Sequence, residues 1–412
     1  MLLRPHQQRG CAAMEQHTIG QLIMPTGSGK TPTMIFDCKR IFETVVAATI
    51  VVVAPRILLA EQLSAEFLEH ITNAAVLHVH TGETHHFSTT RPNVIHQWVE
   101  SHNSRNKLIF TTYNSLKRIQ QSGVDVHTIY FDEAHNSVKR HFFPATEYFA
   151  AVADRCYFFT ATPKHSNTAA KPGMNDVDVY GKVICDVPAT EMVQQGYILP
   201  PTVVPYVVDY ERLKGDLACN SDHMTLLNMI DEMGDDANHK ILVAVPSSKV
   251  MWNLLSQTTA IQDLQDRGFD VLHITSKYGA WVNQTKVNRE VFFDTFNDWG
   301  KDPSRKFVIF HYSILAEGIN VHGLTHTILL RTLDVIEMAQ TIGRVIRLNR
   351  DDAADLSSGK IPAGNFTMYR KPTGFVTVPV FKNYGQRTID RLQNLVNTIF
   401  VEGKPAISVV NR

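Results

Sequence analysis

The sequence of 412 residues has only five cysteines and no CxxC pair. This scarcity argues against a zinc ribbon or a disulfide framework and favours a reducing, cytosol-like compartment. No stretch reaches the roughly 18 consecutive apolar residues that a membrane span requires, and the first residues lack the charged-then-apolar layout of a signal peptide. We therefore expect a cytoplasmic protein that does not contact a membrane.

The sequence also lacks an excess of charge of either sign. Lysine plus arginine and aspartate plus glutamate both total 40, so the formal net charge is zero. Any polyanion must therefore be bound by a local groove rather than by a global field. A hydrophobic content of 44% with 19% charged residues is typical of a folded globular chain.

Two series of short apolar runs, each run followed by a helix-compatible stretch, predict the fold class. Continuous apolar runs indicate strands that are buried on both faces, as in a parallel sheet covered by helices. We therefore predict an α/β protein with two domains. The runs are 21–24, 50–54, 107–111, 128–131 and 156–160 in the first series, and 241–245, 271–274, 307–310 and 327–330 in the second.

A cluster of glycine and prolines between Gly196 and Pro205 predicts the domain boundary, because proline stops helices and stiffens connections. We place domain 1 at residues 1–198 and domain 2 at residues 199–412. Within the second domain, residues 351–412 predict an added loop, a strand over "GFVTVPVF" and a helix from 385 to about 400.

The segment "PTGSGKT" (25–31) predicts a phosphate-binding loop. Gly27 and Gly29 let backbone amides approach phosphate oxygens closely. Lys30 places a positive charge at the β and γ phosphates, and the Thr31 hydroxyl can ligate Mg²⁺. Met24 stands where the strict GxxxxGK[ST] pattern has glycine, and a chance glycine-rich turn is the alternative for this motif alone.

The acidic pair Asp132 and Glu133 in "DEAH" directly follows an apolar run. Asp132 would hold Mg²⁺ through water, and Glu133 would orient and deprotonate the attacking water. A solvated acidic turn is the alternative. Farther along, Thr160 and Thr162 in "TATP" could contact the acidic element "DEAH" and relay the presence of the γ phosphate, although a plain strand end is equally consistent with these letters.

Late in the chain, "QTIGRVIR" spaces Gln340, Gly343, Arg344 and Arg347 so that one helix would carry them on one face. Two arginines and a glutamine facing one way could bind γ phosphate charge. A solvated basic helix face is the alternative.

In their order and separation, "PTGSGKT", "DEAH" and "TATP" resemble motifs I, II and III of superfamily 2 helicases and translocases. The resemblance implies two RecA-like domains with an ATP cleft between them, and ATP with Mg²⁺ as ligands. It assigns Thr31 and Asp132 to Mg²⁺. The residues that it assigns to phosphate binding are Thr26, Gly27, Ser28, Gly29, Lys30 and Thr31.

The resemblance extends to the flanking segments. In "LRPHQQRG", Gln7 would bind the adenine edge and Arg4 would support it. "QTIGRVIR" is similar to motif VI, which makes Arg347 the arginine finger and Arg344 its partner. "SILAEGINVHGL" is similar to motif V. It places Gly318 and Asn320 against the nucleotide, and the role of Asn320 stays open because many relatives carry aspartate there.

Candidate contacts to the nucleic-acid backbone come from four of these segments. Such contacts read phosphates rather than sequence, and an ordinary surface polar residue is the alternative for each. The candidates are Arg56 in the segment similar to motif Ia, Thr112 in motif Ib, Ser276 after motif IV and Ser313 in motif V.

The chain as a whole is most similar to phage UvsW-type helicases, RecG-like remodelers and the motor subunits of type III restriction enzymes. We therefore expect an ATP-dependent DNA helicase or translocase acting on branched or duplex DNA, in a host cytoplasm if the chain is phage-encoded. An RNA helicase and an ATP-driven nucleic-acid clamp or sensor are the alternatives. DNA is favoured over RNA, because residues 324–339 leave no room for the hairpin of DEAH-box RNA helicases. We expect a near-minimal motor, with a protein partner that supplies strand separation or targeting.

Two smaller features complete the expectations. The stretch "HVHTGETHHF" contains His78, His80, His85 and His86, and we interpret it as a surface loop, because no carboxylate or cysteine completes a metal site at close spacing. Arg370 and Lys371 precede the last predicted strand. They could extend a nucleic-acid groove or simply form a basic strand end.

Overall fold

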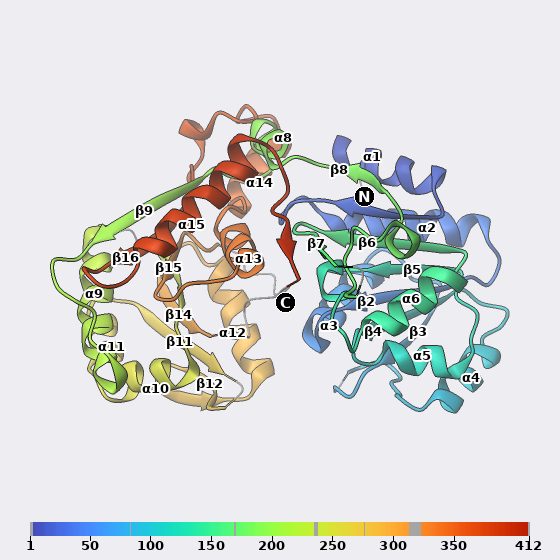
Figure 1. Cartoon of the computed structure of the whole chain (residues 1–412), viewed down its shortest axis with the longest axis horizontal. Coiled ribbons are helices and arrows are strands. Elements are labelled where there is room, and N and C mark those ends of the chain that lie inside the picture. The colour runs from blue at the N-terminus through green and yellow to red at the C-terminus, as the bar shows by residue number, and fades with distance from the viewer. Residues whose placement is uncertain are drawn as a thin grey trace. The chain divides into compact units, whose positions relative to one another are not determined.

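A computed structural model describes residues 3–82, 84–168, 170–234, 238–275, 277–312 and 323–410. The chain forms two compact units (Figure 1). One unit runs as far as Ala189 and also includes the chain from Pro405 onward, whereas the other spans Thr190–Lys404. The last residues join the first unit because β17 (Ser408–Val409) pairs with β7 (Lys164–His165). The boundary at 198/199 stays a prediction.

The first unit contains a sheet of seven strands in the order β3-β4-β2-β5-β6-β1-β8, and every neighbouring pair is parallel. The strands are β1 (Ile19–Ile23), β2 (Thr49–Ala54), β3 (Ala75–Val79), β4 (Lys107–Thr112), β5 (Thr128–Phe131), β6 (Arg155–Thr160) and β8 (Val183–Asp186). The helices are α1 (Pro5–Gln16), α2 (Lys30–Thr44), α3 (Ile57–Leu68), α4 (Pro92–Ser101), α5 (Leu116–Ser122), α6 (Phe143–Val152) and α7 (Val177–Tyr180).

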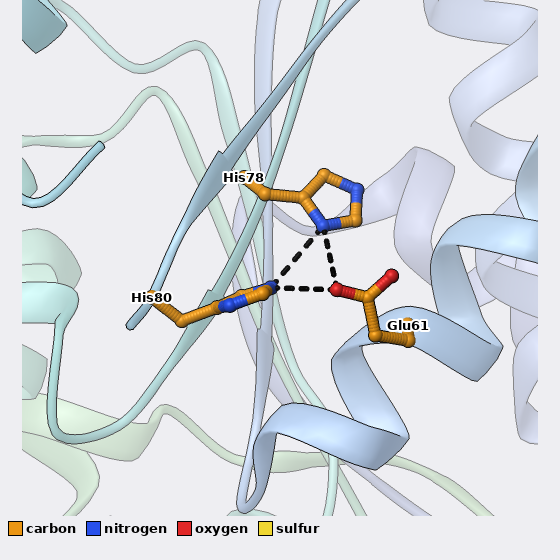
Figure 2. Close-up of side chains that lie close together, drawn as sticks. All are labelled: Glu61, His78 and His80. Carbon is orange, nitrogen blue, oxygen red and sulfur yellow. Dashed lines mark hydrogen bonds and ion pairs between the residues drawn. The ribbon is translucent and has the colours of Figure 1, made fainter. Parts of the chain in front are cut away.

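The edge strand β3 contains the start of the histidine-rich stretch, so the interpretation of that stretch as a surface loop was wrong for His78 and His80. Both residues are buried, since 0% of His78 and 3% of His80 is exposed to solvent. Glu61 of α3 contacts both rings (Figure 2). The sequence did not reveal this carboxylate because it comes from a helix 17 residues before His78.

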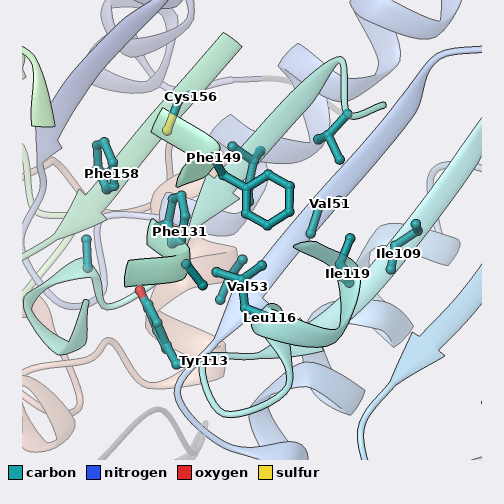
Figure 3. Packing of buried hydrophobic residues seen from close by; sticks show 14 of the residues in the cluster. Val51, Val53, Ile109, Tyr113, Leu116, Ile119, Phe131, Phe149, Cys156 and Phe158 are labelled. Atoms are coloured by element: carbon teal, nitrogen blue, oxygen red, sulfur yellow. The ribbon is translucent and has the colours of Figure 1, made fainter. Parts of the chain in front are cut away.

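The core of the first unit explains why its strands have continuous apolar runs. On one face of the sheet, Val51, Val53 and Ile109 pack against Leu116 and Ile119 of α5 (Figure 3). The intervening residues of β2 and β4 face the other way and are also buried, so both strands are buried at all six positions. Burial on both faces is the expected environment of a parallel sheet covered by helices.

A buried ion-pair network fixes α2, the helix that follows the predicted phosphate loop. Asp37 is fully buried and binds both terminal nitrogens of Arg155 on β6, at 2.9 and 3.0 Å. The Tyr130 hydroxyl of β5 donates to the same carboxylate at 2.6 Å, and Arg40 donates to it at 2.8 Å. Because a buried charge is tolerated only when it is paired, these bonds set the position of α2 on the sheet.

The second unit contains an eight-stranded sheet in the order β13-β12-β11-β14-β10-β15-β16-β9. Its strands are parallel except at the β11-β12-β13 edge, which is antiparallel. The strands are β9 (Pro201–Val207), β10 (Lys240–Ala244), β11 (Asp270–Thr275), β12 (Gly279–Val282), β13 (Thr285–Val287), β14 (Phe307–His311), β15 (His326–Leu329) and β16 (Gly374–Val380). The helices are α8 (Ala189–Gln194), α9 (Ala218–Glu232), α10 (Ser248–Ser256), α11 (Ala260–Asp266), α12 (Arg289–Lys301), α13 (Val335–Val345), α14 (Arg350–Ser357) and α15 (Gln386–Val396).

These two sheets with flanking helices confirm the predicted α/β class. All five cysteines are buried free thiols. Within the described part of the chain, no helix combines the length and the apolar character that a bilayer span requires.

Candidate functional site

The loop between β1 and α2 has the backbone geometry of a phosphate cradle. Gly27 and Gly29 have φ angles of 85° and 86°, a conformation that L side chains rarely adopt. The helix begins at Lys30 directly after Gly29, so the positive end of the helix dipole faces the loop. The predicted phosphate-binding residues, Thr26 to Thr31, therefore lie in one continuous turn at a helix N-terminus.

The side chain of Gln7 contacts this loop. Its amide nitrogen donates to the carbonyl oxygen of Ser28 at 3.1 Å, and its side-chain oxygen accepts from the backbone amide of Arg4 at 2.8 Å. A Cβ atom on Gly29 would lie 2.2 Å from the Gln7 amide nitrogen, so any other residue would displace the Gln7 side chain, and the φ angle of 86° favours glycine there. Adenine contacts of Arg4 and Gln7 stay predictions.

The acidic pair lies at the carboxyl end of β5 and meets the phosphate loop. The Lys30 ammonium is 3.0 Å from Glu133 Oε1, and this contact joins residues 103 positions apart. Glu133 has a φ angle of 47°. This left-handed conformation costs a non-glycine residue about 1–3 kcal/mol and concentrates at functional sites. The fold thus brings together Lys30, Asp132 and Glu133 as predicted.

Asp132 is a buried carboxylate with unused hydrogen-bonding capacity. It is 6% exposed, and its Oδ1 atom has no hydrogen-bond partner within the described residues. Burial, followed by the charge of Glu133, raises the pKa of this carboxyl group above its usual value. The Tyr113 hydroxyl donates to the backbone oxygen of Asp132 at 2.8 Å and so fixes the main chain. A cation would stabilise the ionised carboxylate here.

These residues fit a magnesium ion and a nucleoside triphosphate. The loop amides and Lys30 match phosphate oxygens, whereas the unpaired oxygen of Asp132 and the hydroxyl of Thr31 are ligands that Mg²⁺ prefers. When bound, Mg²⁺ would supply charge neutralisation at the phosphates. Glu133 would orient and deprotonate the attacking water, and this role stays a prediction.

The "TATP" segment contacts the acidic element through His135. The Thr160 hydroxyl lies 3.0 Å from His135 Nδ1, and the Thr162 hydroxyl lies 3.4 Å from the same nitrogen. His135 also lies 3.5 Å from Glu133 Oε2. Sequence reasoning assigned no role to His135, although its place in the "DEAH" letters was a usable signal. A relay of the γ phosphate state through these contacts stays a prediction.

In the second unit, α13 carries Gln340 and Arg344 one helical turn apart, and both are buried, with 6% and 3% exposed. The side-chain amide of Gln340 has no hydrogen-bond partner among the residues that the structure describes. The helix ends at Val345. The prediction that one helix also carries Arg347 was therefore wrong, because Arg347 follows the last helical turn in a bend.

Contacts to the backbone explain why the helix ends before Arg347. The backbone amide of Leu199 donates to the carbonyl oxygen of Ile346 at 2.8 Å. The ammonium of Lys371 donates to the carbonyl oxygen of Arg347 at 2.9 Å. A second helix, α14, then begins with Asn349 as its N-cap. The turn that holds Arg347 is thus fixed from two sides.

Lys371 and Arg370 do not form an open basic surface. Lys371 is buried, and burial, followed by the charge of Arg347, lowers its pKa to about 7. Arg370 pairs with Asp352 and Asp355 of α14. Of the two alternatives from the sequence, the one in which Lys371 extends a nucleic-acid groove is therefore wrong. Its contact with Arg347 was missed because the two residues are 24 positions apart and belong to no shared motif.

Two candidate nucleic-acid contacts lie at or just after the ends of neighbouring strands. Arg56 is the N-cap of α3 and follows β2, and Thr112 is the last residue of β4. The two strands are paired so that Ala54 lies opposite Thr112. Thr112 is only 4% exposed. The other two nucleic-acid candidates, Ser276 and Ser313, and the nucleotide-binding candidates, Gly318 and Asn320, lie outside the described residues.

Comparison with protein families identifies the class. Residues 1–165 match the type III restriction enzyme res subunit family, and residues 224–349 match the helicase conserved C-terminal domain. Together the matches span more than half of the chain. The protein belongs to the superfamily 2 helicases, with two RecA-like domains. None of the curated proteins matches it in sequence.

Solved structures share the fold. The ATP-dependent Type ISP restriction-modification enzyme LlaBIII bound to DNA matches with a TM-score of 0.70 at 15% identity, over 100% of this chain and 31% of that one. A nuclease-deletion mutant of the Type ISP enzyme LlaGI, in complex with a DNA substrate mimic, matches with a TM-score of 0.60 at 16% identity. The match covers 99% of this chain and 30% of that one.

A fragment described as an HsdR subunit of a type I restriction enzyme from Vibrio vulnificus YJ016 gives a TM-score of 0.60 at 16% identity, over 100% of this chain and 69% of that one. At such identities the likeness establishes the fold. The chain spans about a third of the length of the two Type ISP enzymes.

Proposed function

We propose that this protein is an ATP-dependent DNA helicase or translocase that couples ATP hydrolysis to movement on, or remodelling of, branched or duplex DNA. The observation that carries the proposal is the meeting of Lys30, Asp132 and Glu133 beyond the carboxyl ends of strands β1 and β5 of the first sheet. A phosphate cradle, a buried carboxylate with one oxygen that has no hydrogen-bond partner among the described residues, and a second carboxylate beside the lysine are the parts that hydrolysis of a nucleoside triphosphate requires.

In this proposal each unit contributes a different part of the chemistry. Lys30 binds the β and γ phosphates, Thr31 and Asp132 hold Mg²⁺, and Glu133 activates water. Arg344 and Arg347 of the second unit neutralise charge that develops on the γ phosphate, and Gln340 contacts the nucleotide. Hydrolysis then requires the units to close on ATP, and product release lets them separate.

Alternating grip of the phosphate backbone would convert these cycles into steps. The proposed contacts are Arg56 and Thr112 in the first unit and Ser276 and Ser313 in the second. Such contacts suit a chain with no net charge, because a local groove binds the backbone without reading bases. Gly318 and Asn320 are proposed to lie against the nucleotide.

Two observations favour DNA as the track. The similar Type ISP structures were solved with DNA or a DNA substrate mimic. Between Gly323 and α13, the chain forms the single strand β15, so the hairpin expected of DEAH-box RNA helicases is missing from these described residues. Because this segment holds no strand-splitting pin, we assign strand separation or targeting to a protein partner.

The rate of ATP hydrolysis with different nucleic acids tests the choice of track. The assay compares the full chain alone and with single-stranded DNA, duplex DNA, forked DNA or RNA of matched length. We expect low basal turnover and the strongest stimulation by DNA. Stimulation by RNA alone would overturn the choice of DNA, and a rate that no nucleic acid changes would contradict the proposed motor.

A further inference from the structure

Three side chains outside the nucleotide site direct their ligand atoms at one another. They are Glu61 on α3, His78 on β3 and His80 just after β3 (Figure 2). His78 Nδ1 lies 3.2 Å from Glu61 Oε1 and 3.2 Å from His80 Nε2, and His80 Nε2 lies 3.1 Å from Glu61 Oε1. The cluster lies at the edge of the sheet, with four strands between β3 and β1.

Hydrogen bonding alone leaves one side of this triangle without a favourable interaction. Each ring can direct a single proton from the nitrogen that faces the cluster. If both protons point at Glu61, the two nitrogens face each other at 3.2 Å with no shared proton. If either nitrogen is unprotonated, its lone pair faces the carboxylate oxygen. A cation at the centre would instead bind the lone pairs of all three atoms.

The spacing of the three atoms matches a tetrahedral metal. Zinc binds histidine nitrogen and carboxylate oxygen at about 2.0–2.1 Å, which separates neighbouring tetrahedral ligands by about 3.3–3.4 Å. The three observed separations of 3.1–3.2 Å are within a few tenths of an ångström of this ligand-to-ligand distance. Small side-chain movements would therefore complete the geometry.

Neighbouring groups orient these ligands. The Ser64 hydroxyl lies 2.9 Å from His78 Nε2, the ring nitrogen on the far side from the cluster. Such outer contacts fix the orientation and tautomer of a metal-binding histidine. The Thr84 hydroxyl donates to Glu61 Oε2 at 3.2 Å. One contact opposes binding: the Gly82 amide lies 3.3 Å from His80 Nδ1, which must carry the proton when Nε2 binds a metal.

We propose that Glu61, His78 and His80 form a site for a divalent transition metal, and that Zn²⁺ is its best occupant. Two imidazoles and one carboxylate suit zinc, whereas Ca²⁺ and Mg²⁺ prefer sites made of oxygen ligands. A water molecule or the Thr84 hydroxyl supplies the fourth ligand. When the metal binds, each neutral ring keeps its one proton on the nitrogen that faces away from the metal, so a proton on the binding nitrogen is exchanged through solvent for one on the other ring nitrogen.

The location of this site assigns it a structural role. The metal joins α3 to β3, and α3 begins directly after Arg56. Both histidines are buried, so a bound ion would have little access to a large substrate. Metal binding would stabilise the folded first unit and fix the start of α3. The metal site does not depend on the proposed motor activity.

Metal content and thermal unfolding test the site without an activity assay. The full chain is stripped with EDTA, and Zn²⁺, Co²⁺ or Ca²⁺ is added back. We expect one tightly bound Zn²⁺ per chain and a visible Co²⁺ spectrum of tetrahedral type. At a 100-fold excess of Zn²⁺ over Kd, we expect the thermal midpoint to rise by about 5 °C or more. Ca²⁺ should leave it unchanged.

Variants distinguish metal binding at this site from non-specific binding to other histidines. His78→Ala and His80→Ala should lose the bound equivalent, and Glu61→Gln should weaken binding at least about tenfold. His85→Ala is the matched control, because His85 is exposed and outside the triad. A wild-type chain that binds no Zn²⁺ and no Co²⁺ would overturn the proposal. Equal binding by His80→Ala and His85→Ala would also overturn it. The wild-type Co²⁺ spectrum decides the matter even if a triad variant fails to fold.

Discussion

The Lys30→Ala protein is expected to hydrolyse ATP about 10²- to 10³-fold more slowly than the wild type in the presence of DNA, the scale found when one preorganised charge-stabilising donor is removed. Lys30 begins α2 and contacts Glu133 at 3.0 Å. In the proposed site its charge moves onto the phosphates when nucleotide binds. Removing it therefore weakens both the binding of ATP and the stabilisation of charge during hydrolysis.

Steady-state phosphate release measures the effect of Lys30→Ala. Lys39→Ala is the matched control, because Lys39 lies on the same helix and is only partly buried. Its rate should stay within about twofold of wild type. Thermal unfolding should show that both variants are folded. A Lys30→Ala protein with the wild-type rate would place the hydrolytic site elsewhere in the chain.

The Arg347→Ala protein is expected to lose about 10³- to 10⁵-fold in turnover, the range for an arginine finger in phosphoryl transfer. Arg347 lies in a turn after α13 whose backbone Lys371 fixes. The side chain can therefore change without disturbing the anchored main chain. ATP binding should change much less than turnover, because the proposed phosphate cradle belongs to the first unit.

Two measurements isolate this effect of Arg347→Ala. Single-turnover hydrolysis reports the chemical step, and titration with a fluorescent ATP analogue reports binding. Arg350→Ala serves as the control, because Arg350 is an exposed residue at the start of α14. If Arg347→Ala hydrolyses ATP at the wild-type rate, the second unit does not complete the site, and the proposed closing of the two units fails.

The parts of the fold that the sequence predicted share one physical property. Central parallel strands are buried on both faces, so their apolar runs are unbroken, and β5 was predicted at its observed bounds. Strands at the sheet edges could not be recognised in this way. In β9, partly exposed positions and two prolines match an edge strand, whereas in the sequence these prolines served only to place the domain boundary. The antiparallel β12 and β13 were also missed.

The candidate site also has parts that the sequence predicted and parts that it did not. The phosphate loop and the acidic pair are contiguous motifs that directly follow apolar runs, so their chemistry could be predicted from the sequence, and the carboxyl ends of parallel strands are where ligands bind. Contacts between distant segments carry no such signal. Lys371 at the Arg347 carbonyl depends on tertiary packing, and so does Glu61 beside His78 and His80. The end of α13 before Arg347 is likewise set by backbone contacts from outside the helix.

Displacement of a triplex-forming strand from duplex DNA tests the central claim most directly, because it requires movement along the track and no strand separation. With ATP, the wild-type chain should release the third strand, at a rate that falls as the distance to the triplex grows. Lys30→Ala and Arg347→Ala should release none. ATP hydrolysis that DNA stimulates, without any release of the third strand, would contradict a motor and identify a nucleic-acid clamp.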